Sequence, residues 1–205
     1  MNSLENRLDK EVEDYLERVE GTPEISALLK GEIDRDDYVR LLKTCYMIEH
    51  VSRRAVLLAS RNTKDTNPYL SQRFDYCAKG EEGHAQIALN DLKGMGVEGV
   101  AISDIPSAEE YDSHLQEAAE NFPLGILGHS YLFENASGIM FPKHPGHDYP
   151  SVFIDVHAKE DPGHSQAIKR TVRNVETELS EEEVDKVVTF ARESGERLLK
   201  IFQGV

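Results

Sequence analysis

The sequence predicts an all-α, single-domain helical bundle of six to eight helices. Apolar residues recur every three or four positions along nearly the whole chain, which is the period of a helix with one buried face. Glycine, proline and capping residues stand where these runs end. With 205 residues and no internal repeat, low-complexity tract or linker, the chain has the length of one domain. We therefore expect residues 1–205 to form a single helical domain.

Capping and stop residues predict the helix boundaries in the first half of the chain. Gly21-Thr22-Pro23 ends the first apolar-periodic run, and Gly31 closes a short second one. Asp34 or Asp36 can cap the third helix through a side-chain oxygen. Gly94-Met95-Gly96 ends the last run. The helices expected in this half cover residues 3–20, 25–29, 34–60 and 68–92.

Several features of the second half complicate the prediction of helices. Residues 97–105 predict a loop or one short strand, and residues 107–121 and 124–141 form two helices or one helix bent near Pro123. Residues 142–150 hold three prolines, two histidines and a glycine, so they predict a surface loop and a candidate lid. Residues 151–177 are periodic, but Pro162-Gly163 should break or kink that helix at a cost of about 3 kcal/mol. Ser180 and Glu183 form a capping box for a last helix that ends near Phe202.

The charge balance excludes several classes of partner. The chain has 38 acidic and 23 basic residues, a net charge of −15, which disfavours nucleic-acid and anionic-membrane surfaces. No run of 18 apolar residues predicts a membrane span, and the charged first 20 residues are unlike a signal peptide. Cys45 and Cys77 both lie in apolar-periodic stretches, as in a reduced, cytoplasmic protein. We expect a cytoplasmic protein with a small-molecule substrate, and a homodimer is one assembly open to it.

Glu81 and His84 are the first candidate metal ligands. Residues three apart share a helix face, and the expected helix over residues 68–92 carries both on an apolar line. In helix bundles the Glu-x-x-His spacing can place a carboxylate and an imidazole on one metal ion. Because the pattern also arises by chance, a surface pair remains the alternative.

A second set of candidate ligands lies on the helix expected over residues 151–177. His157, Asp161 and His164 continue an apolar stripe at steps of four and three, spread over roughly 10 Å of helix. A solvated polar face is the alternative, but a buried Asp without a partner would be costly. Glu134 and Glu49 interrupt two further apolar stripes in the same way. For Glu134 the alternative is an ion pair with Arg53 or Arg54.

The six main candidates together predict a site for two metal ions. Three carboxylates and three imidazoles come from three helices, and mixed oxygen and nitrogen ligation suits iron or manganese. Six ligands are too many for one catalytic ion with an open position. A ferritin-like bundle would need two Glu-x-x-His motifs, and this chain has one. The six residues are Glu81, His84, Glu134, His157, Asp161 and His164.

Three segments carry a resemblance to a known family. They are Lys79-Gly-Glu-Glu-Gly-His-Ala85 continuing to Asn90-Asp-Leu-Lys-Gly-Met-Gly96, then Gly128-His-Ser-Tyr-Leu-Phe-Glu-Asn-Ala-Ser-Gly138, then His157-Ala-Lys-Glu-Asp-Pro-Gly-His164. In their order and spacing the chain resembles the heme-oxygenase-like diiron oxidases and oxygenases. Relatives of that family include the chlamydial protein associating with death domains, the decarboxylase that forms 1-undecene, pyrroloquinoline quinone synthase and thiaminase II.

The resemblance implies an enzyme that holds two iron ions, with manganese or a mixed iron and manganese pair as alternatives, and uses O2 as co-substrate. It would oxidise a small metabolite, such as an amino acid or a fatty acid, through a peroxo-diferric intermediate. The six candidates would be its ligands, with Glu134 as a bridge and Glu49 as a further ligand or a group on the substrate side. Glu82 remains an alternative to Glu81 as the inward carboxylate.

The resemblance also bears on its other relatives. Heme oxygenases bind heme through a His in the first helix, and no His precedes His50 here, so we expect no heme. Thiaminase II uses a catalytic Cys, to which neither Cys45 nor Cys77 corresponds clearly. The alternative function is a metal-free member of the fold that binds a small molecule or a partner protein, as thiaminase II-like or pyrroloquinoline quinone synthase-like chains do.

The apolar stripes next to the candidate ligands predict a substrate pocket. Tyr131 lies one helical turn before Glu134 and is a candidate redox-active or hydrogen-bonding group beside the metal. A tyrosine on an apolar stripe is more commonly a core residue, which is the alternative. The residues expected to line the pocket are Leu42, Phe74, Leu127 and Phe153.

Overall fold

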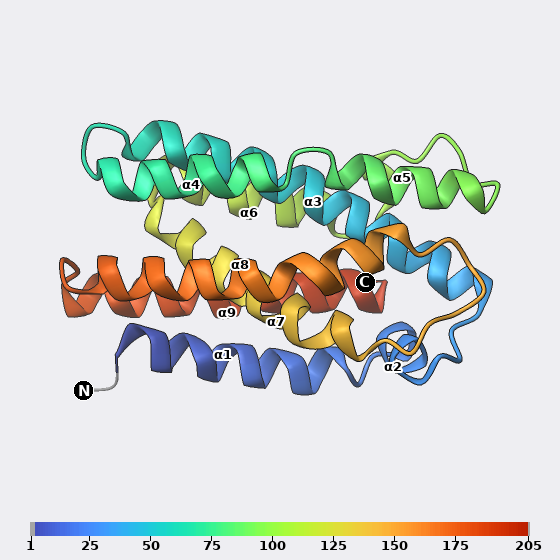
Figure 1. Cartoon of the computed structure of the whole chain (residues 1–205). Helices are drawn as coiled ribbons and strands as arrows, with labels where there is room; N and C mark the ends of the chain where they lie inside the picture. Colours follow the sequence, from blue (N-terminus) through green and yellow to red (C-terminus); the bar gives the residue numbers. More distant parts are fainter. Residues whose placement is uncertain (1–2, 205) are drawn as a thin grey trace.

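The computed structural model describes residues 3–204. Figure 1 shows long helices running roughly along one direction, with α3 to α6 on one side and α1 on the other. The predicted all-α fold class is confirmed. The elements are α1 (Leu4–Val19), α2 (Pro23–Lys30), α3 (Arg35–Thr63), α4 (Pro68–Gly80), α5 (His84–Gly94), α6 (Ala108–Asn121), α7 (Leu124–Met140), α8 (Val152–Glu176) and α9 (Glu181–Gln203), with 3-10 turns at Ile102–Asp104 and Phe141–Lys143.

Two helices organise the packing. α3 contacts α4, α5 and α6, while α7 contacts α1, α8 and α9, and contacts of α5 with α8 and of α6 with α7 join the two sets. The apolar side chains of all these helices form one buried cluster. Within residues 3–204, no helix combines the length and the apolar composition that crossing a bilayer requires.

Several predicted boundaries hold because the expected side chains cap the helices. The side chain of Asp34, and not that of Asp36, accepts the backbone N–H of Asp37 at the start of α3. Ser180 and Glu183 form the predicted capping box of α9. Between α6 and α7 the chain leaves the helical conformation at Phe122, so these are two helices and not one bent helix.

Other predictions are wrong, and the reasons are tertiary. The helix expected over residues 68–92 divides into α4 and α5. For residues 97–105 the loop alternative is confirmed, since they contain a 3-10 turn and no strand. α8 continues through Pro162 without ending. At this point α7 lies close to α8. A Cβ added to Gly138 would lie only 3.2 Å from the Asp161 carbonyl oxygen. The stabilisation from packing against α7 thus exceeds the cost of losing the backbone hydrogen bond that the proline removes.

The loop expected over residues 142–150 is held against α3. Its first residues complete the 3-10 turn at Phe141–Lys143. The Tyr38 hydroxyl donates a hydrogen bond of 2.9 Å to the Pro150 carbonyl, and the Tyr38 ring packs against those of His147 and Tyr149. These contacts fix the start of α8, which carries the candidate ligands.

The contact of α7 with α9 gives a first testable prediction. A Cβ on Gly128 would lie 2.6 Å from the Val187 carbonyl oxygen, so Gly128→Ala must push the two helices apart. We expect the free energy of unfolding, measured with urea, to fall by about 1–3 kcal/mol, the usual cost of overpacking. Gly163→Ala in α8 is the matched control, because nothing lies within 4 Å of its Cβ position. This control should be neutral or stabilising by up to about 1 kcal/mol; equal losses in both variants would contradict the prediction.

Candidate metal centre

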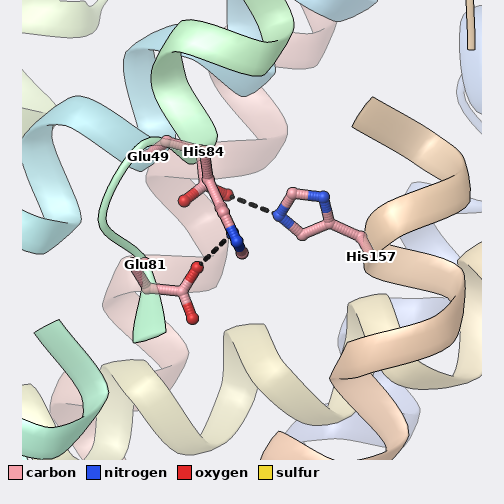
Figure 2. Close-up of side chains that lie close together, drawn as sticks. All are labelled: Glu49, Glu81, His84 and His157. Atoms are coloured by element: carbon pink, nitrogen blue, oxygen red, sulfur yellow. Dashed lines mark ion pairs between the residues drawn. The ribbon is translucent and has the colours of Figure 1, made fainter. Parts of the chain in front are cut away.

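Four side chains from distant parts of the sequence meet inside the bundle (Figure 2). Glu49 comes from the middle of α3, Glu81 and His84 flank the turn between α4 and α5, and His157 lies on α8. One carboxylate oxygen or ring nitrogen from each lies within 4.8 Å of those from the other three. Two carboxylates and two imidazoles form a donor set that suits a first-row divalent metal ion.

A chain turn, and not a helix face, brings Glu81 and His84 together. Gly83 has a φ of +97°, a left-handed backbone conformation that glycine adopts without steric cost, and it separates α4 from α5. Glu81 therefore caps the end of α4 and His84 opens α5. Glu81 Oε2 lies 2.6 Å from His84 Nδ1. The expectation of one helical line through both residues is thus wrong, although the two side chains do meet.

The contact between Glu49 and His157 is the most informative in the group. His157 Nδ1 donates a hydrogen bond of 2.7 Å to the Phe153 carbonyl oxygen, which leaves Nε2 of the neutral ring with a lone pair. That Nε2 faces Glu49 Oε1 at 3.3 Å, and the two side chains are only 2% and 3% exposed. Among the residues that the structure describes, no third group forms a hydrogen bond with either atom. Because both are acceptors, a proton or a metal cation must lie between them.

A second group shares one carboxylate with the first. Glu81, Glu134 and His164 also bring one ligand atom each to within 4.8 Å of the others. His164 Nδ1 lies 3.3 Å from Glu81 Oε1 and 3.4 Å from Glu134 Oε2. The two oxygens of Glu81 therefore face different imidazoles. Glu81 therefore belongs to both groups, because the turn after α4 projects it between α5 and α8. The bridging role expected of Glu134 stays a prediction.

Asp161 lies beside the second group but belongs to neither. Its side chain is buried, and its Oδ1 is 3.7 Å from His164 Nδ1. Within residues 3–204 its Oδ2 has no hydrogen-bond partner. The structure thus places Asp161 at the edge of the cluster, and its role as a ligand stays a prediction.

The two alternatives left open for the carboxylates are resolved by position. Glu82 is exposed and lies 3.7 Å from Arg53, so Glu81 is the inward residue of the pair. Glu134 forms no ion pair with either candidate arginine. Arg53 donates to the Ala78 carbonyl, and Arg54 contacts Asp112.

The electrostatics of the cluster favour bound protons when no metal is present. Burial raises the pKa of Glu134 to about 7 and that of Asp161 to about 6. Burial also lowers the pKa of His157, but the Glu49 carboxylate outweighs it and raises the value to about 9. The hydrogen bond with Glu134 raises the pKa of His164 to about 9. At neutral pH these two imidazoles are therefore protonated, and a metal ion would compete with protons for them.

Sequence reasoning misses His129 of α7. Its ring is 1% exposed, its Nε2 lies 3.1 Å from Ser52 Oγ, and its Nδ1 has no partner. Burial lowers its pKa to about 3, so the ring is neutral. His129 lines a cavity of about 20 Å³ that also touches Glu49, Glu81 and Glu134. A signal was present, since His129 stands in the apolar run of α7, which is buried on nearly every side.

Of the four residues predicted to line a substrate pocket, one lines a cavity beside the candidate ligands. Phe153 lines a narrow cavity of about 30 Å³ beside Glu49, but Leu42, Phe74 and Leu127 are buried in the core and do not line it. An apolar stripe does not distinguish core positions from cavity walls, which is why these three expectations are wrong. The other residues that line this inner cavity are Tyr15, Ile25, Leu41, Cys45, Ile48, Phe133, Ala136, Ser137, Met140, Phe141 and Phe202.

Tyr131 does not take the position expected beside the metal ligands. Its hydroxyl donates a hydrogen bond of 2.7 Å to Asp9 on α1, and Lys169 lies over its ring. Tyr131 therefore joins α7 to α1 as part of the core, which was the alternative interpretation.

Comparisons with known proteins establish the fold and no more. No protein-family model and no curated protein matches the sequence. Among solved structures, a Shewanella denitrificans domain of unknown function with a heme oxygenase-like fold is 20% identical, with a TM-score of 0.77 over 99% of this chain and 91% of that one. A TenA homologue from Pyrococcus furiosus is 14% identical, with a TM-score of 0.82 over 98% of both chains. Heme oxygenase-1 from the cyanobacterium Synechocystis, solved with heme, is 14% identical, with a TM-score of 0.67 over 98% of this chain and 91% of that one. The chain therefore has the heme oxygenase-like fold.

The raised pKa values of His157 and His164 predict how metal affinity depends on pH. A metal ion binds the unprotonated nitrogen, so the apparent affinity for Mn²⁺ should rise from pH 6.5 towards pH 9. The gain should approach about tenfold per pH unit for each imidazole that must lose its proton. Calorimetric titrations in buffers of different ionisation enthalpy would count the protons released. Binding of Mn²⁺ with no proton release at pH 7 would contradict the assignment of these rings as ligands.

Proposed function

We propose that this protein binds two divalent metal ions, iron foremost, and uses them to activate O2 for the oxidation of a small metabolite. The facing acceptors of Glu49 and His157 carry this proposal. They are buried and 3.3 Å apart, and within residues 3–204 neither atom bonds to any third group. A metal ion that displaces the proton between them would bind both. The sharing of Glu81 by both groups supports two ions rather than one.

The donor atoms also favour the kind of metal. All the grouped ligands are carboxylate oxygens and imidazole nitrogens, the set that suits iron or manganese. Neither Cys45 nor Cys77 belongs to a group, so there is no thiolate to favour zinc or copper. Bound iron would supply the redox chemistry that O2 reduction requires, with the polypeptide controlling geometry and access.

The surrounding residues orient the ligands and exclude water. The Nδ1–H of His157 donates to the Phe153 carbonyl, which fixes the ring with Nε2 towards Glu49. The Phe153 and Phe141 rings pack against the His157 ring, with centroids 4.0 and 6.1 Å away. Ser165 donates to the Glu134 backbone carbonyl and ties α8 to α7 beside the second group. The inner cavity ends at Glu49, so a substrate there would lie next to the proposed ions.

The competing function is a metal-free protein that binds a small molecule or a partner. The similarity to TenA homologues favours it, with a TM-score of 0.82 for one from Pyrococcus furiosus. In that case the protonated imidazoles and carboxylates would serve as polar pocket lining. A thiaminase II-like nucleophile is a poor fit, because burial raises the pKa of the Cys77 thiol to about 12 and that of Cys45 further still.

Anaerobic titration of the metal-free chain with Fe²⁺ separates the two functions. Saturation at two ions per chain, followed by a transient visible absorption when O2 is added, is the result expected for O2 activation. Failure to bind any Fe²⁺ would overturn the proposal and leave the metal-free function. Oxygen uptake by the iron-loaded protein, screened across metabolites, would then identify the substrate.

Removing a single carboxylate should affect both ions. Because Glu81 belongs to both groups, Glu81→Gln should lower iron content from two ions per chain to fewer than one. His164→Ala removes a ligand of the second group only, so it should leave about one ion. Iron would be measured by mass spectrometry after anaerobic desalting. Glu82→Gln is the matched control, because this exposed neighbour points away, and it should keep both ions. Equal losses in Glu81→Gln and Glu82→Gln would refute the assignment.

A further inference from the structure

A cavity that opens at the surface is not explained by the metal centre. This outer pocket has a volume of about 390 Å³ and lies between α2, α3, the 3-10 turn before α6, and the end of α9. Its lining consists of Glu24, Arg40, Leu41, Lys43, Thr44, Asp104, Ile105, Pro106, Ile201, Phe202, Gln203 and Gly204.

Two side chains separate the outer pocket from the inner cavity. Leu41 and Phe202 line both. On the far side of this wall the inner cavity continues to Glu49 and Phe153. The residues that line both spaces are thus one leucine and one phenylalanine, whose side chains can change rotamer without moving the backbone.

Helix α3 contributes lining residues to both spaces. Lys43 and Thr44 face the outer pocket, Leu41 faces both, and Cys45 and Glu49 face the inner cavity. From Lys43 to Glu49 the helix axis advances about 9 Å. A small elongated molecule could therefore touch the outer pocket and the Glu49 end at the same time.

The two spaces differ in charge and polarity. The inner cavity is lined by apolar side chains apart from Glu49, Ser137 and weakly polar groups, and it has no lysine or arginine. In the outer pocket, Arg40 is paired with Glu24 and contacts Asp37, and Asp104 accepts the Ala101 N–H. Lys43 is half-buried and forms no ion pair or hydrogen bond within residues 3–204. It is therefore the cation left available to a ligand.

We propose that the outer pocket is the substrate entrance, and that the substrate is an amphiphile whose anionic head stays at Lys43 while its apolar chain passes between Leu41 and Phe202 towards Glu49. This assignment rests on the proposed function for the chemistry at the inner end. It places a carbon chain, and not the charged head, next to the metal ligands.

Binding to the metal-free protein tests the entrance without relying on iron. Octanoate, octylammonium and octanol serve as probes, because they share one chain and differ in the charge of the head. Calorimetric titration should show octanoate binding, with octylammonium at least tenfold weaker. Lys43→Glu should weaken octanoate binding at least tenfold and leave octanol unchanged. Phe202→Trp, which fills the gap, should weaken octanoate and octanol alike by at least tenfold.

Matched controls keep the result specific. Lys64→Glu, at the exposed end of the same helix, makes the same change of charge, and Phe122→Trp makes the same change of ring at a distant site. Both should bind octanoate as the unmodified chain does. The assignment of the entrance would be wrong if octylammonium bound tightly, if octanoate did not bind, or if Phe202→Trp bound octanoate and octanol as the unmodified chain does.

Parallel Fe²⁺ titrations distinguish the failure of this assignment from failure of the proposed function. If the unmodified chain binds no iron but octanoate binding depends on Lys43 and Phe202, the proposed function is wrong and the assignment of the entrance is supported. If two iron ions bind per chain but octanoate does not bind, or binds equally well without Lys43 and Phe202, the assignment of the entrance is wrong and the proposed function is not affected.

Discussion

The structure depends on balancing negative charge inside a helical bundle. Glu49, Glu81, Glu134 and Asp161 lie close together in the interior, and none pairs with a lysine or arginine within residues 3–204. Isolated carboxylates in such a place are costly. Three imidazoles supply the compensation, as acceptors for protons in the metal-free chain or as ligands beside a metal ion. The arrangement is therefore one in which protons and metal ions compete for the same atoms.

The backbone is adapted to hold this cluster. A left-handed Gly83 divides α4 from α5 and turns Glu81 inward, while Gly138 allows α7 to approach the α8 backbone where Asp161 and His164 lie. The Asp91 carboxylate accepts the Phe153 N–H at 2.8 Å and ties α5 to the start of α8. Each device joins two helices that carry ligands. The ligand atoms are thus positioned by contacts between helices rather than by the helical repeat.

The two cavities follow one another from the protein surface to the candidate metal centre. The inner cavity meets the cluster at Glu49, and the outer pocket meets the inner cavity at Leu41 and Phe202. α3 contributes residues to all three and so links the surface to the site. A polar outer end and an apolar inner end favour substrates that are themselves amphiphilic. In the proposed entrance, recognition of a charged head would be separate from chemistry on a carbon chain.

The sequence by itself determined the helical class, most helix ends and the candidate ligands, because periodicity and capping are local properties of the chain. Tertiary structure alone decided that α8 continues through Pro162, that Glu81 belongs to both groups, and that Tyr131 turns towards Asp9. It also decided which apolar residues line a cavity, since Leu42 and Phe153 have similar patterns but different surroundings. A stripe of residues records which side of a helix is buried. Whether that side contacts core residues, a cavity or other ligands depends on the neighbouring helices. Those contacts join distant segments, so no single segment of sequence predicts them.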